Sequence, residues 1–170
     1  MIIEEAQKKG ISVVGLNEDL VNRLGLSEGL DHGAIVPLYF LKKAGVDIPV
    51  VIISMGMLPY LELYRLGTII SEAATRINCR TAVLASSDLS HRLTRDAPSG
   101  YHPDGERFDR EVVRLVGDGD IEALITLDPE MVENAGECGL RPIIIALGTV
   151  DGLEIKSSVL SYQCPFGVGY

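Results

Sequence analysis

The segment SSDLSH, residues 86–91, gathers hydroxyl and carboxylate side chains around one of the three histidines of the chain. A histidine beside a carboxylate such as Asp88 is suited to proton transfer, because the carboxylate fixes the tautomer and imidazole titrates near neutral pH. The alternative is a turn in which Asp88 and Ser90 bond to the backbone and His91 is merely exposed. A serine-hydrolase triad is not favoured, because its members do not lie in one short run and no GxSxG motif occurs.

The segment GECGLRP places two further candidate metal ligands, Glu137 and Cys138, between glycines. The alternative is a helix that ends at Gly136, with Cys138 as a small buried hydrophobic side chain. Counting ligands suggests a set of His32, His91 and Glu137, two imidazoles and one carboxylate, as in non-haem Fe(II) oxygenases. The wide separation of these residues in the sequence neither supports nor excludes such a set.

The charge of the chain limits its partners. Fifteen basic and 24 acidic residues give a net charge of −9, and the basic residues are scattered. Because phosphate binding needs clustered lysines and arginines, neither nucleic acid nor an anionic membrane surface is an expected partner. The segment GDGDIE is too short for an EF-hand loop, and no glycine-rich phosphate-binding loop occurs.

The cysteines and the apolar segments indicate a cytoplasmic protein. Cys79, Cys138 and Cys164 form no CxxC pair and no disulfide framework, which favours a reducing compartment. No apolar run approaches the roughly 18 residues of a membrane span, and the first residues lack the basic region of a signal peptide.

Hydrophobic periodicity predicts alternating strands and helices in a single domain over residues 1–170. The predicted strands, short and rich in β-branched residues, are 11–16, 48–56, 80–88, 154–162 and 166–170. The predicted helices are the last turns of a helix ending at Gly10, then 31–45, 61–77, 105–119, 120–127 and 129–136. Residues 17–27 read as a polar loop, and GLRPIIIALG, residues 139–148, fits either a strand or a buried helix.

This order predicts an α/β fold with helices on both faces of a mostly parallel or mixed sheet. Ligands of such folds gather beyond the carboxyl ends of strands, and SSDLSH follows the predicted strand 80–88. Asp31, Asp120 and Asp128 are expected to cap the helices that follow them.

Four motifs in series, LDHGAIVPLYFL, SSDLSHRL, GECGLRPIIIALG and SYQCPFGVGY, cover most of the chain. Together they resemble the catalytic B subunit of class III extradiol ring-cleaving dioxygenases, the LigB family. The nearest resemblance is to an uncharacterised bacterial branch that is related to the Memo proteins and often joined to an AMMECR-type domain. The resemblance implies a three-layer α/β/α sandwich.

The resemblance also implies a chemistry. Enzymes of the family hold Fe(II) with two histidines and one glutamate, bind a catechol-type aromatic substrate and open its ring with O2. His91 is implied to be the acid/base group, and His32 to line the same pocket. Glu137 is implied to be the carboxylate ligand, and in Memo proteins a cysteine matching Cys138 takes the metal position.

The two metal-binding histidines of the family lie before the segment that matches residue 1. The chain is therefore expected to be an N-terminally truncated member, with an incomplete sheet and poor iron binding of its own. Three readings stay open: an extradiol dioxygenase, a Memo-like metal-binding or interaction protein, and a structural remnant that forms homo-oligomers.

Overall fold

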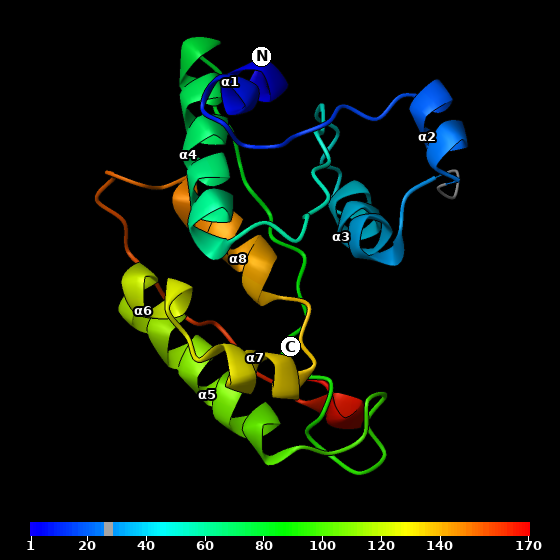
Figure 1. Ribbon diagram of the computed structural model, residues 1–170, viewed down its shortest axis with the longest axis vertical. Coiled ribbons are helices and arrows are strands. Elements are labelled where there is room, and N and C mark those ends of the chain that lie inside the picture. The colour runs from blue at the N-terminus through cyan, green and yellow to red at the C-terminus, as the bar shows by residue number, and fades with distance from the viewer. Residues whose placement is uncertain (26–28) are drawn as a thin grey trace. The chain divides into compact units, whose positions relative to one another are not determined.

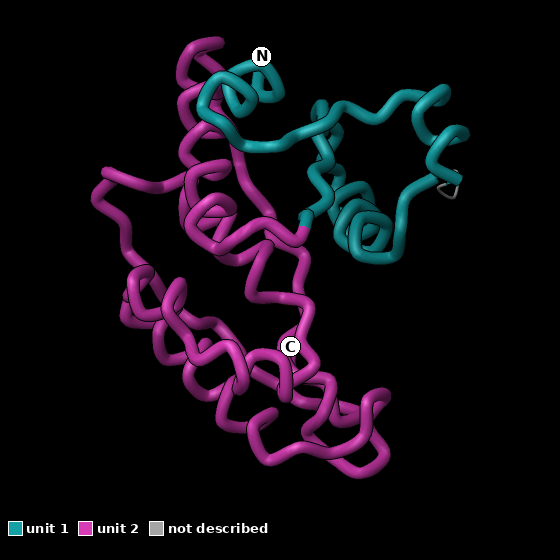
Figure 2. Tube along the Cα trace, viewed as in Figure 1, with its two compact units in different colours: residues 1–56 teal, residues 57–170 magenta. Residues whose placement is uncertain are grey.

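The computed structural model describes residues 1–25 and 29–170. These residues form two compact units, residues 1–56 and residues 57–170 (Figure 2). The single domain predicted over residues 1–170 stays a prediction.

The first unit holds helices α1 (Ile2–Lys8), α2 (Glu18–Leu24) and α3 (His32–Lys43) (Figure 1). The predicted cap of α3 is confirmed, because Asp31 Oδ1 accepts the Ala34 N–H at 2.9 Å. Helix α2 lies where the sequence predicted a loop, although residues 26–28 of that loop lie outside the described residues. Its signal is the capping residue Asn17, whose side chain accepts the Leu20 N–H, followed by acidic residues in the first turn.

The second unit holds most of the helical structure. Its α-helices are α4 (Tyr60–Arg76), α5 (Pro103–Asp118), α6 (Ile121–Ile125), α7 (Pro129–Ala135) and α8 (Leu140–Gly148). A short 3-10 turn, η1 (Pro165–Gly167), lies close to the C-terminus. The predicted helices of this region are confirmed, including the caps at Asp120 and Asp128. The ambiguous segment 139–148 is helix α8, because Pro142 stands in the first turn, where its missing N–H costs no hydrogen bond.

Helix contacts build the core of this unit: α4 packs against α8, and α5 packs against α6 and α7 (Figure 1), while α6 also contacts α8. The α4–α8 contact is unusually close at Gly67 and Gly148. A Cβ at Gly67 would lie 2.2 Å from the Ile145 carbonyl oxygen, and one at Gly148 would lie 2.1 Å from that of Tyr64. The fully buried large apolar side chains are Leu63, Ile69, Phe108, Val112, Leu115, Leu124, Leu140 and Ile144.

The predicted three-layer α/β/α sandwich is wrong, since no described residue belongs to a strand. The segments predicted as strands run as irregular chain, and several of their apolar side chains are exposed, Val51 by 75% and Leu160 by 95%. Gln163 and Tyr170 exchange two backbone hydrogen bonds, each N–H donating to the other residue's carbonyl. Such isolated pairs do not extend into the hydrogen-bond ladder of a sheet. A β-branched pattern is local, whereas a strand needs a neighbouring strand, and these segments have none in the described residues.

A buried carboxylate ties helix α5 to two distant segments. Asp109 is 1% exposed and accepts the Ser90 N–H at 2.7 Å and the Tyr162 hydroxyl at 2.6 Å. Its burial raises the pKa of the carboxyl group above the ordinary value of 3.8, although both hydrogen bonds and the charge of His91 act to lower it. Among the described helices, none is long and apolar enough to cross a membrane.

Replacing Gly67 or Gly148 with alanine should destabilise the second unit by about 2–4 kcal/mol, because the added methyl group collides with backbone that cannot move aside. Gly117 in α5 is the matched control, since a Cβ there meets its nearest heavy atom at 3.6 Å. Gly117→Ala should be neutral or stabilising by about 0.5–1 kcal/mol. Urea unfolding measures the change in the free energy of unfolding for each variant. An equal change in Gly117→Ala and in Gly67→Ala or Gly148→Ala would contradict the close packing of α4 against α8.

Asp109→Asn should change how stability depends on pH. Because the folded pKa of Asp109 is raised, its contribution is complete below about pH 3.8 and is lost as pH rises through the folded pKa. The wild type should therefore lose stability relative to Asp109→Asn as pH rises from 4, until the carboxyl group is fully ionised. Urea unfolding across pH 4–8 measures this, with exposed Asp118→Asn as the charge control. If the wild type instead gained stability relative to Asp109→Asn as pH rises, the folded pKa of Asp109 would be lowered and not raised.

Candidate functional site

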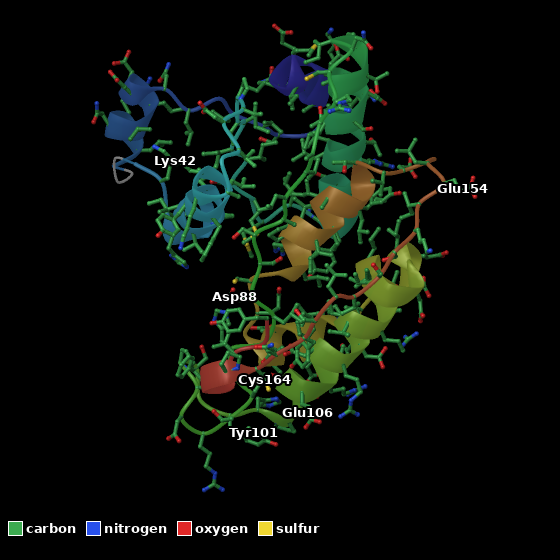
Figure 3. All side chains as sticks on the ribbon, turned by 180° about the vertical axis from the view of Figure 1, so that it is seen from behind. Lys42, Asp88, Tyr101, Glu106, Glu154 and Cys164 are labelled. Atoms are coloured by element: carbon green, nitrogen blue, oxygen red, sulfur yellow. The ribbon has the colours of Figure 1, made fainter. Side chains whose placement is uncertain are left out.

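The imidazole of His91 lies among two other side chains that can bind protons or metals. Its Nε2 is 3.6 Å from Asp88 Oδ2 and 3.8 Å from Cys138 Sγ. One ligand atom from each of the three residues lies within 4.8 Å of the other two. Figure 3 labels Asp88, which stands on irregular chain rather than on a helix. We call Asp88, His91 and Cys138 the His91 cluster.

The chain on either side of His91 is anchored by buried Ser90. The Ser90 hydroxyl donates to the Ala135 carbonyl at 2.8 Å and accepts the Arg92 N–H at 3.0 Å, while the Ser90 N–H is held by Asp109. The neighbouring His91 N–H also donates to Ala135, and its carbonyl accepts the Ser99 N–H. The backbone of His91 is thus fixed on both sides, whereas its side chain stays 26% exposed.

The segments SSDLSH and GECGLRP approach each other closely through their backbones. A Cβ at Gly139 would lie 2.5 Å from the Asp88 carbonyl oxygen, so only glycine allows this approach. The Cys138 thiol donates weakly to the same carbonyl at 3.8 Å. Burial is the main cause that raises the pKa of Cys138 and keeps the thiol protonated at neutral pH.

Glu137 caps helix α8 and does not join the His91 cluster. Its Oε2 accepts the Leu140 N–H at 2.6 Å. Burial raises the pKa of this carboxyl group, while the backbone hydrogen bonds and the charges of Arg141 and His91 act to lower it. Glu137 therefore lies within electrostatic reach of both side chains.

The other histidines lie in different settings. His32 is the first residue of α3 in the first unit and is exposed, so its place beside His91 stays a prediction. His102 caps α5, where its Nδ1 accepts the Asp104 N–H at 3.2 Å.

A site of two histidines and one glutamate for iron does not form in the described part of the second unit. The nearest donors to His91 are a carboxylate and a thiol, and Glu137 is bonded to helix backbone instead. The residues present therefore do not fit that site. Their mixed oxygen, nitrogen and sulfur donors suit a borderline-soft metal ion.

The sequence prediction missed three residues of this region. Asp109 could have been found, because it lies three residues before the buried apolar Val112 on the same face of an amphipathic helix. Arg141 and Tyr60 gave no signal, since their contact joins α8 to a helix some 80 residues earlier in the chain.

The family described as the catalytic LigB subunit of aromatic ring-opening dioxygenase matches residues 1–170. The chain is 41% identical over 169 residues to Protein CA_C1420 of Clostridium acetobutylicum. The matched segment covers 99% of this chain and 36% of that protein. The chain is also 26% identical over 159 residues to 3,4-dihydroxyphenylacetate 2,3-dioxygenase of Escherichia coli. The matched segment covers 87% of this chain and 54% of that enzyme.

The chain thus spans little more than a third of the first relative and about half of the second. The match to the family extends from the first residue to the last and includes every residue of the His91 cluster. The chain belongs to the LigB family of aromatic ring-opening dioxygenase subunits.

Proposed function

We propose that the chain is part of an extradiol dioxygenase, which opens catechol-type rings with O2 and non-haem Fe(II), and that His91 is its acid/base group. Membership in the LigB family supports the reaction class. The observation that carries the role of His91 is its geometry: a partly exposed imidazole on a fixed backbone, with its Nε2 facing the Asp88 carboxylate.

The proposed chemistry of the chain concerns protons. A catechol must lose a proton from a hydroxyl group before O2 attacks the ring, and the opening ring must receive one. His91 would accept the first proton at Nε2 and later return it. The Asp88 carboxylate, whose Oδ2 lies 3.6 Å from His91 Nε2, would stabilise the protonated imidazole without moving. The oxygen-inserting step is assigned to no residue described above.

The proposed substrate is a small aromatic diol. The Escherichia coli relative is named for its action on 3,4-dihydroxyphenylacetate, which makes this compound the first to test. Self-association, an AMMECR-type partner and a cytoplasmic location stay predictions from the sequence.

His91→Gln should lower turnover of 3,4-dihydroxyphenylacetate by about 10²–10⁴-fold, because glutamine keeps polar contacts but cannot carry the proton. The measurement is ring-opening followed by absorbance, made on the whole enzyme of which this chain is proposed to be part, loaded anaerobically with Fe(II) and then exposed to O2. His102→Gln is the matched control, since His102 is a helix cap outside the His91 cluster, and it should stay within a few-fold of the wild type. Absence of turnover by the wild type, or equal turnover by His91→Gln, would overturn the proposal.

A second candidate function is metal binding without ring cleavage, as in the Memo-like reading of the sequence. The grouping of the Asp88, His91 and Cys138 donor atoms within 4.8 Å favours it. The two functions exclude each other at His91, because an imidazole nitrogen that binds a metal cannot also transfer a proton.

Metal binding by the His91 cluster predicts one tightly bound Zn2+ or Fe2+ per chain. Cys138→Ser should lower the affinity by at least about tenfold, because a hydroxyl is a far poorer ligand than a thiolate. Cys79→Ser is the control, since Cys79 is exposed and lies outside the cluster. Competition with a chromogenic chelator measures the affinity, and an unchanged affinity in Cys138→Ser would remove this candidate.

A further inference from the structure

The C-terminal segment, residues 167–169, is bonded to the backbone just before His91. The Leu89 N–H donates to the Gly169 carbonyl at 2.8 Å, and the Gly169 N–H donates to the Ser90 carbonyl at 2.9 Å. Both hydrogen bonds lie within the second unit and join parts of the chain that are far apart in the sequence. The C-terminal segment therefore helps to fix the residue from which the imidazole of His91 projects.

The same segment is bonded to the backbone just after His91. The Leu93 N–H donates to the Gly167 carbonyl at 3.1 Å. Gly167 has a φ of 76°, in the left-handed region, and a Cβ there would lie 2.7 Å from the Ala97 Cβ. Only glycine combines this backbone conformation with such close contact, so the sequence at this position serves the approach of the two segments.

Gly169 also makes room for the buried carboxylate of Asp109. A Cβ at Gly169 would collide with Asp109 Oδ2 and lie 2.9 Å from its Cγ. The carboxylate cannot simply move aside, because its Oδ2 accepts the Tyr162 hydroxyl and its Oδ1 accepts the Ser90 N–H. Burial and the hydrogen bond to Asp109 raise the pKa of Tyr162, so its hydroxyl stays protonated and continues to donate.

We propose that Gly169 and Tyr162 are positioning residues for His91. Gly169 acts through its two backbone hydrogen bonds, and Tyr162 acts through Asp109, whose other oxygen holds the Ser90 N–H. This inference rests on the proposed function, because the place of the imidazole affects a rate only if His91 transfers protons. It extends that function from the imidazole to residues near the C-terminus that hold it in place.

The test measures turnover of 3,4-dihydroxyphenylacetate by the whole enzyme of which this chain is proposed to be part, loaded with Fe(II). Gly169→Ala should lower kcat by about tenfold or more with KM within a few-fold, because a displaced acid/base group slows chemistry without weakening substrate binding. Tyr162→Phe adds no bulk and should lower kcat by about two- to tenfold through the loss of one hydrogen bond. It tests the inference even where Gly169→Ala fails to fold.

The matched controls are Gly117→Ala and Tyr101→Phe. A Cβ at Gly117 meets its nearest heavy atom at 3.6 Å, and Tyr101 is exposed, so both variants should keep the kcat of the wild type.

Amide hydrogen exchange, measured by mass spectrometry on the same proteins, shows whether the loss acts through the His91 segment. Exchange of residues 89–93 should be faster in Gly169→Ala and in Tyr162→Phe, while exchange of helix α4 should stay at the wild-type rate. A general loss of stability would speed up both regions.

A wild-type kcat in Gly169→Ala or in Tyr162→Phe would overturn this inference and leave the proposed function standing. A lowered kcat without faster exchange of residues 89–93, or with equally faster exchange of α4, would also overturn it. Absence of turnover by the wild type would overturn both.

Discussion

The hydrogen bonds of buried Ser90 are the constraint on which the candidate site depends. The Ser90 N–H joins the SSDLSH segment to α5 through Asp109, and the Ser90 hydroxyl joins it to the end of α7 through Ala135. Neither helix could hold His91 alone, because the residue lies on irregular chain with no regular hydrogen-bond ladder of its own. The fixed backbone limits the imidazole to side-chain rotation, which is what a group that transfers protons over short distances needs.

The acidic side chains near His91 differ in burial and therefore in role. Asp109, Glu137 and Cys138 all have a pKa raised chiefly by desolvation, so their protonated forms are favoured relative to exposed groups. Asp109 and Glu137 offset part of this cost by accepting backbone N–H groups, which turns both into structural anchors. Asp88 is partly exposed and close to the His91 ring, so it is the carboxylate left to act on that ring.

The α4–α8 contact decides which side chains meet at the start of α4. Gly67 and Gly148 let the two helix backbones approach closely, and the first turn of α8 then places Arg141 against Tyr60 at the start of α4. Tyr60 and Leu58 receive the guanidinium there. The close packing of two glycines thus decides where the charge of Arg141 stands in the second unit.

The sequence alone determined what depends on neighbouring residues. The α5 and α7 helices follow from periodicity, and the caps at Asp31, Asp120 and Asp128 follow from side chains that reach amides two or three residues away. The sequence also singled out Asp88, His91 and Cys138 as chemically capable residues, and four motifs in series indicated the LigB family, which the comparisons confirm. Tertiary structure decided the rest. The β-branched segments found no partner strand, so the predicted sandwich did not form, because pairing depends on distant chain and not on local pattern. The same holds for the meeting of Cys138 with His91 and of Arg141 with Tyr60, since contacts across some 50 to 80 residues are set by helix packing that no local spacing encodes.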